Sequence, residues 1–365
     1  MTKIKEVINV LEKLAPLAWQ ESYDNAGLQT GNPNDEVTGV LITLDCTLEV
    51  VEEAIRHNCN LIVAHHPVIF KPLKRLTGSN HVEQTIIKAI QHNVAIYASH
   101  TNLDSVLGGV NTKIAQKLGL ENVSILSPKS GALLNLVTFV PQQNTEAVLA
   151  ALHAAGAGQI GDYKNCSFKL SGEGRFLPTG GANPTIGEVG QPEKVKEDRV
   201  EVILPAYLQN RVLEALFKAH PYEEVAYDVY ALKNTNQEVG AGMIGEIPMA
   251  LAYPDFLEEL KQNMGLSTVK HTVHGPGMIK RVAICGGAGS FLLNDARRAL
   301  ADVFITGDLK YHEYFMAEGH LHVCDIGHYE SEVFTKEIFY DLISENFSNF
   351  AVLLSEINTN PVRYS

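Results

Sequence analysis

The sequence predicts an α/β protein: two α/β halves with mostly parallel or mixed sheets form one domain, and an inserted βαββαβ domain interrupts it. Three observations favour this architecture. With 365 residues and 45% hydrophobic composition, the chain can bury a large core and is long enough for two domains. Apolar runs alternate with amphipathic segments towards both ends, which is typical of a sheet covered by helices. The segment between them follows a different order of strands and helices.

The first half is expected over residues 1–128. Apolar residues on one helical face predict a helix near the N-terminus, at Ile4, Val7, Ile8, Leu11 and Leu14. Further helices are predicted at 49–58, between the strands that end at Asp45 and His65, and at 81–93, before the strand that ends at Ser99. This alternation indicates parallel strands joined by helical crossovers.

The insert is expected over residues 129–235. Its predicted order of strand, helix, strand, strand, helix and strand is that of a ferredoxin-like unit. The connection between its second and third strands, residues 172–198, is rich in glycine and proline. It is too long for a plain hairpin, so we expect it to be mobile or to make contacts.

The second half is expected over residues 236–365, where the alternation resumes. Its predicted elements are helix, strand, helix, strand and helix at 254–265, 281–287, 290–301, 303–308 and 331–346. The two flanking halves are expected to rejoin as one catalytic or binding domain.

Composition limits the classes of function. The net charge of −13, from 29 basic and 42 acidic residues, argues against nucleic acid as a partner because an acidic surface repels phosphate backbones. Five cysteines, an odd number placed mostly in apolar runs, indicate no disulfide framework. The N-terminus lacks a signal-peptide core and no stretch is apolar enough to span a bilayer. We expect a cytoplasmic protein without membrane association.

Metal-binding or acid/base residues follow several of the predicted strands. They are Asp45, His65, His66, His100, Asp104, Asp308 and His328. In open α/β sheets ligands bind beyond the carboxyl ends of the strands, so these side chains can converge although they are distant in sequence. We expect a single site.

His65 and His66 stand before Pro67, which favours extended or turn backbone at His66. Regular strand geometry would point the two rings to opposite faces. They can serve one site only if the backbone bends, or if each ring takes a different metal ion. The alternative is one buried, hydrogen-bonded histidine beside an exposed one.

The other candidates are Asp104, His328 and Glu332. Asp104 lies in a polar turn after a strand, where it is a candidate ligand or a cap of the next helix. His328 and Glu332 are four residues apart at a predicted helix start, so they share one helical face. The alternative is that the glutamates are ordinary acidic residues near a helix N-terminus, where a negative charge interacts favourably with the helix dipole. This alternative explains Glu330 better than Glu332.

The five candidates His65, His66, Asp104, His328 and Glu332 suit a divalent ion such as zinc, manganese or iron(II). Five protein ligands exceed those of one catalytic zinc ion. We therefore expect two divalent metal ions per chain and hydrolytic chemistry. Zinc is the first expectation, and iron or manganese are the alternatives.

Further residues are candidates for the surrounding pocket. Gly286, Gly287 and Gly289 follow a strand and precede a helix, a layout that binds phosphate. A tight strand-to-helix turn explains the same pattern. Lys310 is a candidate substrate-binding residue and His312 a candidate catalytic residue for proton transfer, as an alternative to a partner of the metal ligands or a surface position.

Five strings occur in order along the chain: ESYDNAGLQTGNP, AHHPVIF, SHTNLD, GDLKYHEYF and GHYESE. Together they resemble the Nif-three-like metal-binding family, whose members are often labelled GTP cyclohydrolase 1 type 2 homologues. The insert, with HPYEEVAYDVY at 220–230, is similar to the PII-like or CutA-like domain of the longer bacterial members.

The resemblance implies that the five candidate ligands bind two divalent metals, with Asp104 or Glu332 as the bridge. It also implies a toroidal homohexamer of two trimers. The family label implies hydrolytic opening of the guanine imidazole ring of GTP. Three functions follow as hypotheses: a metal-dependent hydrolase of a nucleotide or related phosphorylated small molecule, a metal-binding or metal-trafficking regulator with a ligand-sensing insert and no turnover, and a ring-shaped assembly scaffold.

Overall fold

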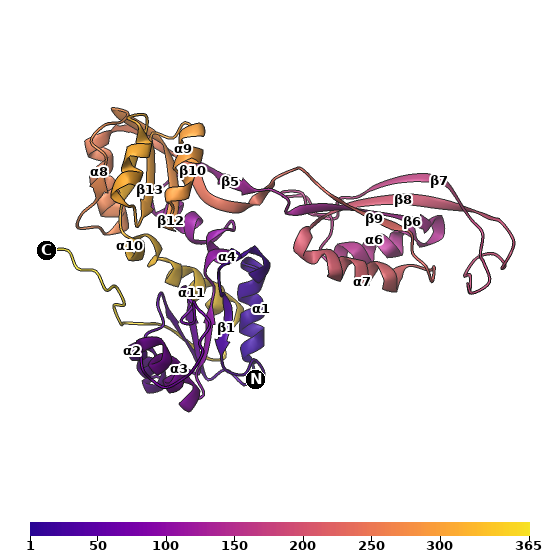
Figure 1. Ribbon diagram of the computed structural model, residues 1–365, viewed down its shortest axis with the longest axis horizontal. Helices are drawn as coiled ribbons and strands as arrows, with labels where there is room; N and C mark the ends of the chain where they lie inside the picture. Colours follow the sequence, from indigo (N-terminus) through magenta and orange to yellow (C-terminus); the bar gives the residue numbers. More distant parts are fainter. The chain divides into compact units, whose positions relative to one another are not determined.

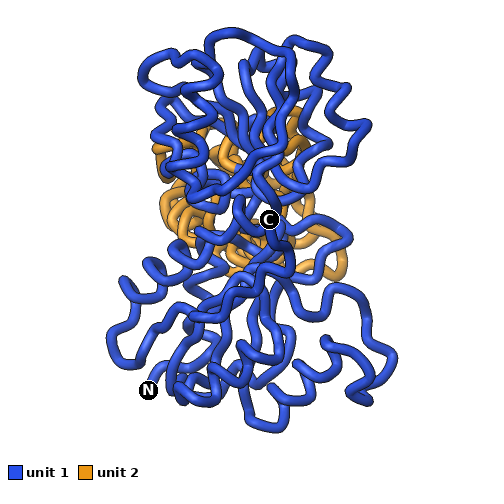
Figure 2. Tube along the Cα trace, turned by 90° about the vertical axis from the view of Figure 1, so that its left-hand side faces the viewer, with its two compact units in different colours: residues 1–127, 239–365 blue, residues 128–238 orange.

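The computed structural model describes residues 1–365 and divides the chain into two compact units. Unit 1 comprises residues 1–127 and 239–365, and unit 2 comprises residues 128–238 (Figure 2). None of the helices combines the length and the apolar composition that crossing a membrane requires. The fold is of the mixed α/β type, with two sheets in unit 1 and one in unit 2.

The first sheet of unit 1 has the strand order β1-β4-β3-β2-β15. Its strands are β1 (Gly27–Thr30), β2 (Gly39–Thr43), β3 (Leu61–Ala64), β4 (Ala95–Ala98) and β15 (Ala351–Leu354). All neighbours are parallel except β1, which is antiparallel to β4. Every residue of β2, β3 and β4 is buried, as expected for parallel strands covered on both faces. β15 comes from the end of the chain, so the second half completes a sheet that the first half begins.

Helices cover this sheet. They are α1 (Ile4–Leu14), α2 (Leu48–Arg56), α3 (His81–Gln91) and α11 (Thr335–Asn346). The helices predicted at 49–58 and 81–93 both end two residues early, because Asn58 and Asn93 adopt positive φ angles of 55° and 54°. Asparagine tolerates this left-handed geometry just after a helix end.

The second sheet of unit 1 has the order β11-β14-β13-β12-β10-β5. Its strands are β5 (Glu121–Lys129), β10 (Asn236–Ala252), β11 (Lys270–His271), β12 (Met278–Ala288), β13 (Val303–Gly307) and β14 (His322–Asp325). β12, β13 and β14 are parallel, whereas β10 and β11 pair antiparallel at either side. The sheet is therefore mixed, and β5 of the first half lies at its edge.

Further helices of unit 1 lie in the connections to and from these strands. They are α4 (Thr101–Asp104), α5 (Val110–Lys117), α8 (Tyr253–Met264), α9 (Leu293–Arg298), α10 (His328–Glu332) and the 3-10 helix η5 (Tyr311–Ala317). α10 follows β14 directly and lies between the two sheets of unit 1 (Figure 1). This position brings residues of both halves of the chain together.

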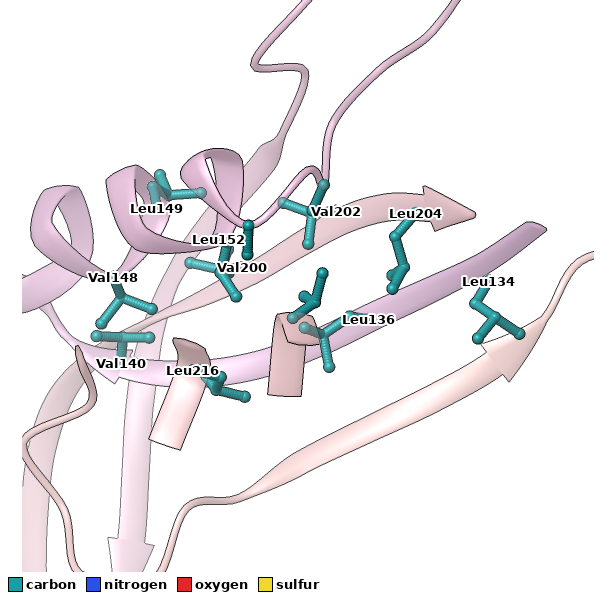
Figure 3. Close-up of a cluster of buried hydrophobic side chains, with 13 residues drawn as sticks. Leu134, Leu136, Val140, Val148, Leu149, Leu152, Val200, Val202, Leu204 and Leu216 are labelled. Atoms are coloured by element: carbon teal, nitrogen blue, oxygen red, sulfur yellow. The ribbon is translucent and has the colours of Figure 1, made fainter. Parts of the chain in front are cut away.

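Unit 2 contains the chain order strand, helix, strand, strand, helix, strand. The elements are β6 (Leu133–Pro141), α6 (Thr145–Ala154), β7 (Phe168–Phe176), β8 (Glu193–Pro205), α7 (Gln209–Ala219) and β9 (Tyr227–Ala231). The strands form one antiparallel sheet in the order β7-β8-β6-β9. Its core contains Val148, Val200 and Leu216, each 0% exposed, where α6 and α7 pack on one face of the sheet (Figure 3).

One sequence prediction for unit 2 is corrected by the strand register. β7 and β8 pair from Phe168↔Glu201 to Phe176↔Glu193, so the true connection is 177–192 and not 172–198. Glycine and alternating charge in these strands conceal the apolar alternation that marks a half-buried strand. Pairing with β6 on the other side of β8 compensates for this weak local preference.

Candidate metal centre

His65 and His66 lie just beyond the end of β3. Both backbone N–H groups donate to the carbonyl of Leu44, at 3.1 and 3.0 Å, which bends the chain away from strand geometry. The two ring centroids are 4.8 Å apart. The bend therefore allows adjacent residues to turn both rings towards one site.

Four histidines of this cluster have the same arrangement: Nδ1 is held by an acceptor and Nε2 is left for the centre. Nδ1 donates from His65 to the Ser99 carbonyl (2.8 Å), from His66 to Asp45 (2.7 Å), from His100 to Asp24 (2.7 Å) and from His328 to Asp308 (2.8 Å). Metal-binding histidines almost always donate their second ring N–H to a carboxylate or carbonyl. The cluster thus has ring orientations that suit metal ligands.

Two carboxylates complete the cluster. Glu332 Oε2 lies 2.9 Å from His66 Nε2 and 3.0 Å from His328 Nε2. His65 Nε2 lies 3.8 Å from Glu332 Oε1 and 3.6 Å from Asp104 Oδ1. His328 and Glu332 occupy one face of α10, whereas Asp104 ends α4 and does not cap α5, whose N-cap residue is Gly109.

These residues form three overlapping groups that could hold a metal ion. The groups are His65–His66–His100, His66–His328–Glu332 and His65–Asp104–Glu332, and the ligand atoms within each lie within 4.8 Å of one another. All five predicted ligands are therefore brought together. His65, His66 and Glu332 each belong to two groups, so they connect the three.

Two atoms of the cluster test directly whether it fits a cation. His65 Nε2 and Asp104 Oδ1 are both buried and have no hydrogen-bond partner. A buried polar atom without a partner is costly. With Nδ1 donating to Ser99, His65 Nε2 is an acceptor, so both atoms are electron-pair donors. A divalent cation would satisfy both, and the donor set of imidazole and carboxylate suits zinc, iron or manganese.

The electrostatics of the cluster also favour a cation. Burial and the charge of Glu332 raise the pKa of Asp104 to about 8. Burial alone would lower the pKa of His66, but hydrogen bonds to Asp45 and Glu332 raise it to about 10. Without a metal, protons thus balance the buried carboxylates. A bound metal would replace these protons, because histidine ligands must be deprotonated at the coordinating nitrogen.

Gly286 and Gly287 are among the last residues of β12, and Gly289 follows the strand. This glycine segment has a packing role, which corrects its interpretation as a phosphate loop. The N–H groups of the three predicted residues are already used: Gly286 donates to Asn111 Oδ1, Gly287 to Ser331 Oγ and Gly289 to Thr306 Oγ1, each at 2.9 Å. Phosphate binding needs such groups free. A Cβ on Gly287 would lie 2.3 Å from Glu332 Oε1. Glycine at this position therefore leaves the space that the Glu332 carboxylate occupies.

His312 and Lys310 do not line the pocket beside the metal-binding cluster, and their roles in proton transfer and substrate binding stay predictions. Both are exposed at the start of η5, and the ring of His312 contacts Tyr311 and Phe315 instead. Asp308, in contrast, contributes to the site because its carboxylate accepts a hydrogen bond from His328 Nδ1. The local string GDLKYHEYF does not distinguish these positions, because its side chains point in different directions after the strand ends.

A pocket of about 380 Å³ opens beside the cluster. His100, Asp104, His328 and Glu332 line it, together with the exposed rings of Tyr23 and Phe291, which are 66% and 65% accessible. No lysine or arginine lines this pocket. Its surface therefore offers flat apolar stacking positions and the ligand atoms, but no protein cation.

Sequence reasoning placed His100 at a strand end but not among the ligands, and it missed the roles of Asp24 and Asp45. Asp24 also accepts from the N–H of Thr101 at 3.1 Å, and Asp45 accepts from Thr359 Oγ1 at 2.6 Å. The available signal was the presence of an aspartate in the strings YDNAG and LITLD. Their partners lie at least 21 residues away, so no local pattern reveals them.

The fold and the cluster define an α/β protein with a buried histidine–carboxylate site able to hold metal ions. Comparison with known proteins identifies the family: the family described as Duf34/NIF3 (NGG1p interacting factor 3) matches residues 2–361. The chain belongs to this family.

Full-length relatives agree with this assignment. A Bacillus subtilis protein named GTP cyclohydrolase 1 type 2 homolog is 38% identical over 99% of this chain and 98% of its own length. The crystal structure of a Bacillus cereus protein related to NIF3 matches 100% of this chain and 99% of that chain, with 38% identity and a TM-score of 0.87. A Staphylococcus aureus protein of known structure matches 100% and 99% of the two chains, with 33% identity and a TM-score of 0.79.

Proposed function

We propose that this protein is a metal-dependent hydrolase that holds two divalent metal ions per chain, zinc first and iron or manganese as alternatives. The three overlapping groups of ligand atoms support this proposal, because they offer more ligands than one catalytic ion takes. Divalent ions in such a site would polarise a substrate oxygen and acidify a water molecule. Either Asp104 or Glu332 would contact both ions, and Glu332 is favoured because it belongs to two groups and lies near three histidines.

The protein's own residues orient the site. Asp45, Asp24 and Asp308 each hold one histidine by its Nδ1 proton, which leaves the Nε2 lone pair of that ring for the centre. Gly286 and Gly287, at the end of β12, carry no side chains and so leave room for the side chain of Glu332. Burial of His65 and Glu332, 0% and 3% exposed, excludes bulk water from one side of the cluster and strengthens its electrostatic interactions.

The pocket limits the substrate. The names of the relatives suggest GTP, and Tyr23 and Phe291 offer ring surfaces on which a nucleobase can stack. The pocket has no lysine or arginine and the glycine-loop amides are occupied. A phosphate would therefore have to bind the metal ions themselves. We infer a nucleotide or related phosphorylated small molecule that presents its reacting oxygen directly to the metal site.

The first experiment measures metal content per chain in the wild type, His65→Ala and Glu332→Gln. His81→Ala is a matched control, because His81 is exposed at the start of α3. About two equivalents in the wild type and the control, with a loss in both site variants, support the dinuclear site. Absence of bound metal, also after reconstitution, would contradict it.

Turnover is tested next with GTP, by following ring opening and phosphate release for the same four proteins. Activity that depends on His65 and Glu332 supports the hydrolase. Tight metal binding without turnover would favour the regulator hypothesis instead. The unpaired His65 Nε2 and Asp104 Oδ1 favour either of these functions over a scaffold, which needs no ligand atoms.

We also propose a ferredoxin-like, PII-related identity for unit 2 and a homohexameric assembly. The element order of unit 2 and its antiparallel sheet support the first. The exposed apolar side chains Val273, Tyr311 and Phe315, at 83%, 73% and 64% accessibility, support an assembly that covers them. Sedimentation equilibrium tests the hexamer, and a monomer at all concentrations would contradict it.

A further inference from the structure

A larger cavity, of about 640 Å³, lies wholly within unit 2. We name it the sheet pocket. On β8, Val200 and Val202 point into the core beneath α6 and α7, and residues of a strand alternate between its two faces. Glu197 and Arg199, which line the pocket, therefore lie on the opposite face of the sheet. Residues of β7, Phe139 of β6, the β7–β8 connection and the α7–β9 connection supply the remaining walls.

The sheet pocket has a largely apolar lining. Leu170 and Phe176 of β7 contribute to it, with Leu177 and Ile186 of the β7–β8 connection. Leu170 and Leu177 are 60% and 53% exposed, so a bound molecule would remove apolar surface from water. The volume falls within the range of about 300–1,000 Å³ that small-molecule sites occupy.

One carboxylate is built into this apolar pocket. Glu197 is only 8% exposed, and its Oε1 accepts from the hydroxyl of Tyr222 at 2.9 Å. His220 anchors the segment that carries Tyr222: its Nδ1 accepts from the N–H of Tyr222 at 3.1 Å, and its Nε2 donates to the Phe139 carbonyl at 3.0 Å. The His-Pro-Tyr segment thus positions a donor on one oxygen of Glu197 and leaves the other oxygen without a hydrogen bond.

The charges of the pocket do not cancel. Its lining contains four glutamates and two arginines. Arg175 pairs with Glu173 of the lining, and Arg199 pairs with Glu201, which lies outside it. The other three lining glutamates, Glu197, Glu223 and Glu224, form no ion pair. A nearly buried carboxylate without a counter-charge favours a cation, because a charge-assisted hydrogen bond offsets its desolvation.

We propose that the sheet pocket binds a small molecule with an apolar ring and a protonated amine. The amine pairs with Glu197, and the ring packs against Phe176 and Leu177. This ligand site is separate from the metal centre and uses only residues of unit 2. The proposal does not depend on the hydrolase function.

The test uses the full-length protein with tryptamine and 2-phenylethylamine as probes, followed by saturation-transfer NMR and titration calorimetry. Indole-3-acetate is the matched comparison, since it has the ring of tryptamine and a carboxylate in place of the amine. For probes of this size we expect a dissociation constant of about 1 mM or tighter. Indole-3-acetate should show no saturable binding.

Variants locate the site. Glu197→Gln keeps the side-chain size and should weaken amine binding at least about tenfold. Glu224→Lys changes an exposed residue, so it should fold normally, and its cation should repel the amine to a similar extent. Glu214→Gln, an exposed control on α7, should bind as the wild type does.

Three results would overturn the proposal: no saturable binding of either amine, equal binding of indole-3-acetate, or unchanged amine affinity in both Glu197→Gln and Glu224→Lys. A second copy of the chain that covered the pocket would give the first of these results.

Discussion

The carboxylate that holds His66 offers the sharpest test of the metal centre. Asp45 accepts from His66 Nδ1 at 2.7 Å and from Thr359 Oγ1 at 2.6 Å. Asp45→Asn keeps the size of the side chain but removes its charge. The asparagine amide can also donate to Nδ1, which would move the ring proton to Nε2, where the metal should bind. The variant thus perturbs metal binding without removing a ligand.

The expected loss of metal affinity follows from the type of contact that Asp45 makes and from its exposure to solvent. Loss of a partner that orients a metal ligand typically weakens metal affinity about 10- to 100-fold, and we expect this range for Asp45→Asn. Asp308→Asn changes the equivalent partner of His328, but the side chain of Asp308 is 56% exposed, against 34% for Asp45. Solvent screens the more exposed pair. The effect of Asp308→Asn should therefore be smaller.

The assay is zinc competition with a chromophoric chelator on metal-stripped protein, with thermal unfolding to confirm that each variant folds. His66→Ala gives the full loss of the ligand, and Asp341→Asn, at an exposed position on α11, gives the effect of removing a distant charge. Wild-type zinc affinity in Asp45→Asn, together with a clear loss in His66→Ala, would refute the reasoning that Asp45 orients the ring.

Three further predictions concern the loop and the insert. Gly287→Ala and Gly319→Ala both place alanine at a positive φ, +62° and +70°, but only Gly287→Ala brings a Cβ against Glu332. Both variants should lose about 1–2 kcal/mol of stability, and only Gly287→Ala should lose bound metal. Full metal content in Gly287→Ala would contradict the packing role of this glycine. Burial lowers the pKa of His220, so the folded state binds fewer protons than the unfolded state, and unit 2 should lose stability as pH falls below about 6.5. Hydrogen exchange of α7 and β9, corrected for intrinsic rates, should show this loss in the wild type and not in His220→Gln; equal protection across this pH range would contradict it. Leu216→Ala, at a site with 0% exposure, should destabilise unit 2 by about 2–5 kcal/mol in denaturant unfolding, and a loss below about 1 kcal/mol would indicate a loosely packed core.

Much of the fold could be predicted because its signals are local. The runs that became β2, β3 and β4 are continuous and apolar, and α2 and α3 show helical periodicity with a capping Thr47 and Asn80. The insert was predicted at 129–235, and unit 2 spans 128–238. The exchange of β5 and β15 between the halves was not predicted, since strand partners depend on distant segments.

The candidate site likewise has a part that the sequence predicts and a part that it does not. His65, His66, Asp104, His328 and Glu332 could be selected because their residue types and their places at strand or helix ends are visible in the sequence. The glycine loop could not be assigned, because a phosphate loop and a tight packing turn share one local pattern. Only the donors' partners, Asn111, Ser331 and Thr306, decide between them.

Residue type, periodicity and capping thus determined which segments form helices and strands, and which side chains are able to bind a metal. Only the tertiary structure decided which of these atoms converge, which N–H groups remain free and which carboxylate holds each ring. These properties depend on contacts at 2.7–3.8 Å between residues up to 267 positions apart, such as His65 and Glu332. Local preferences do not encode such distances, because chain packing brings the partners together.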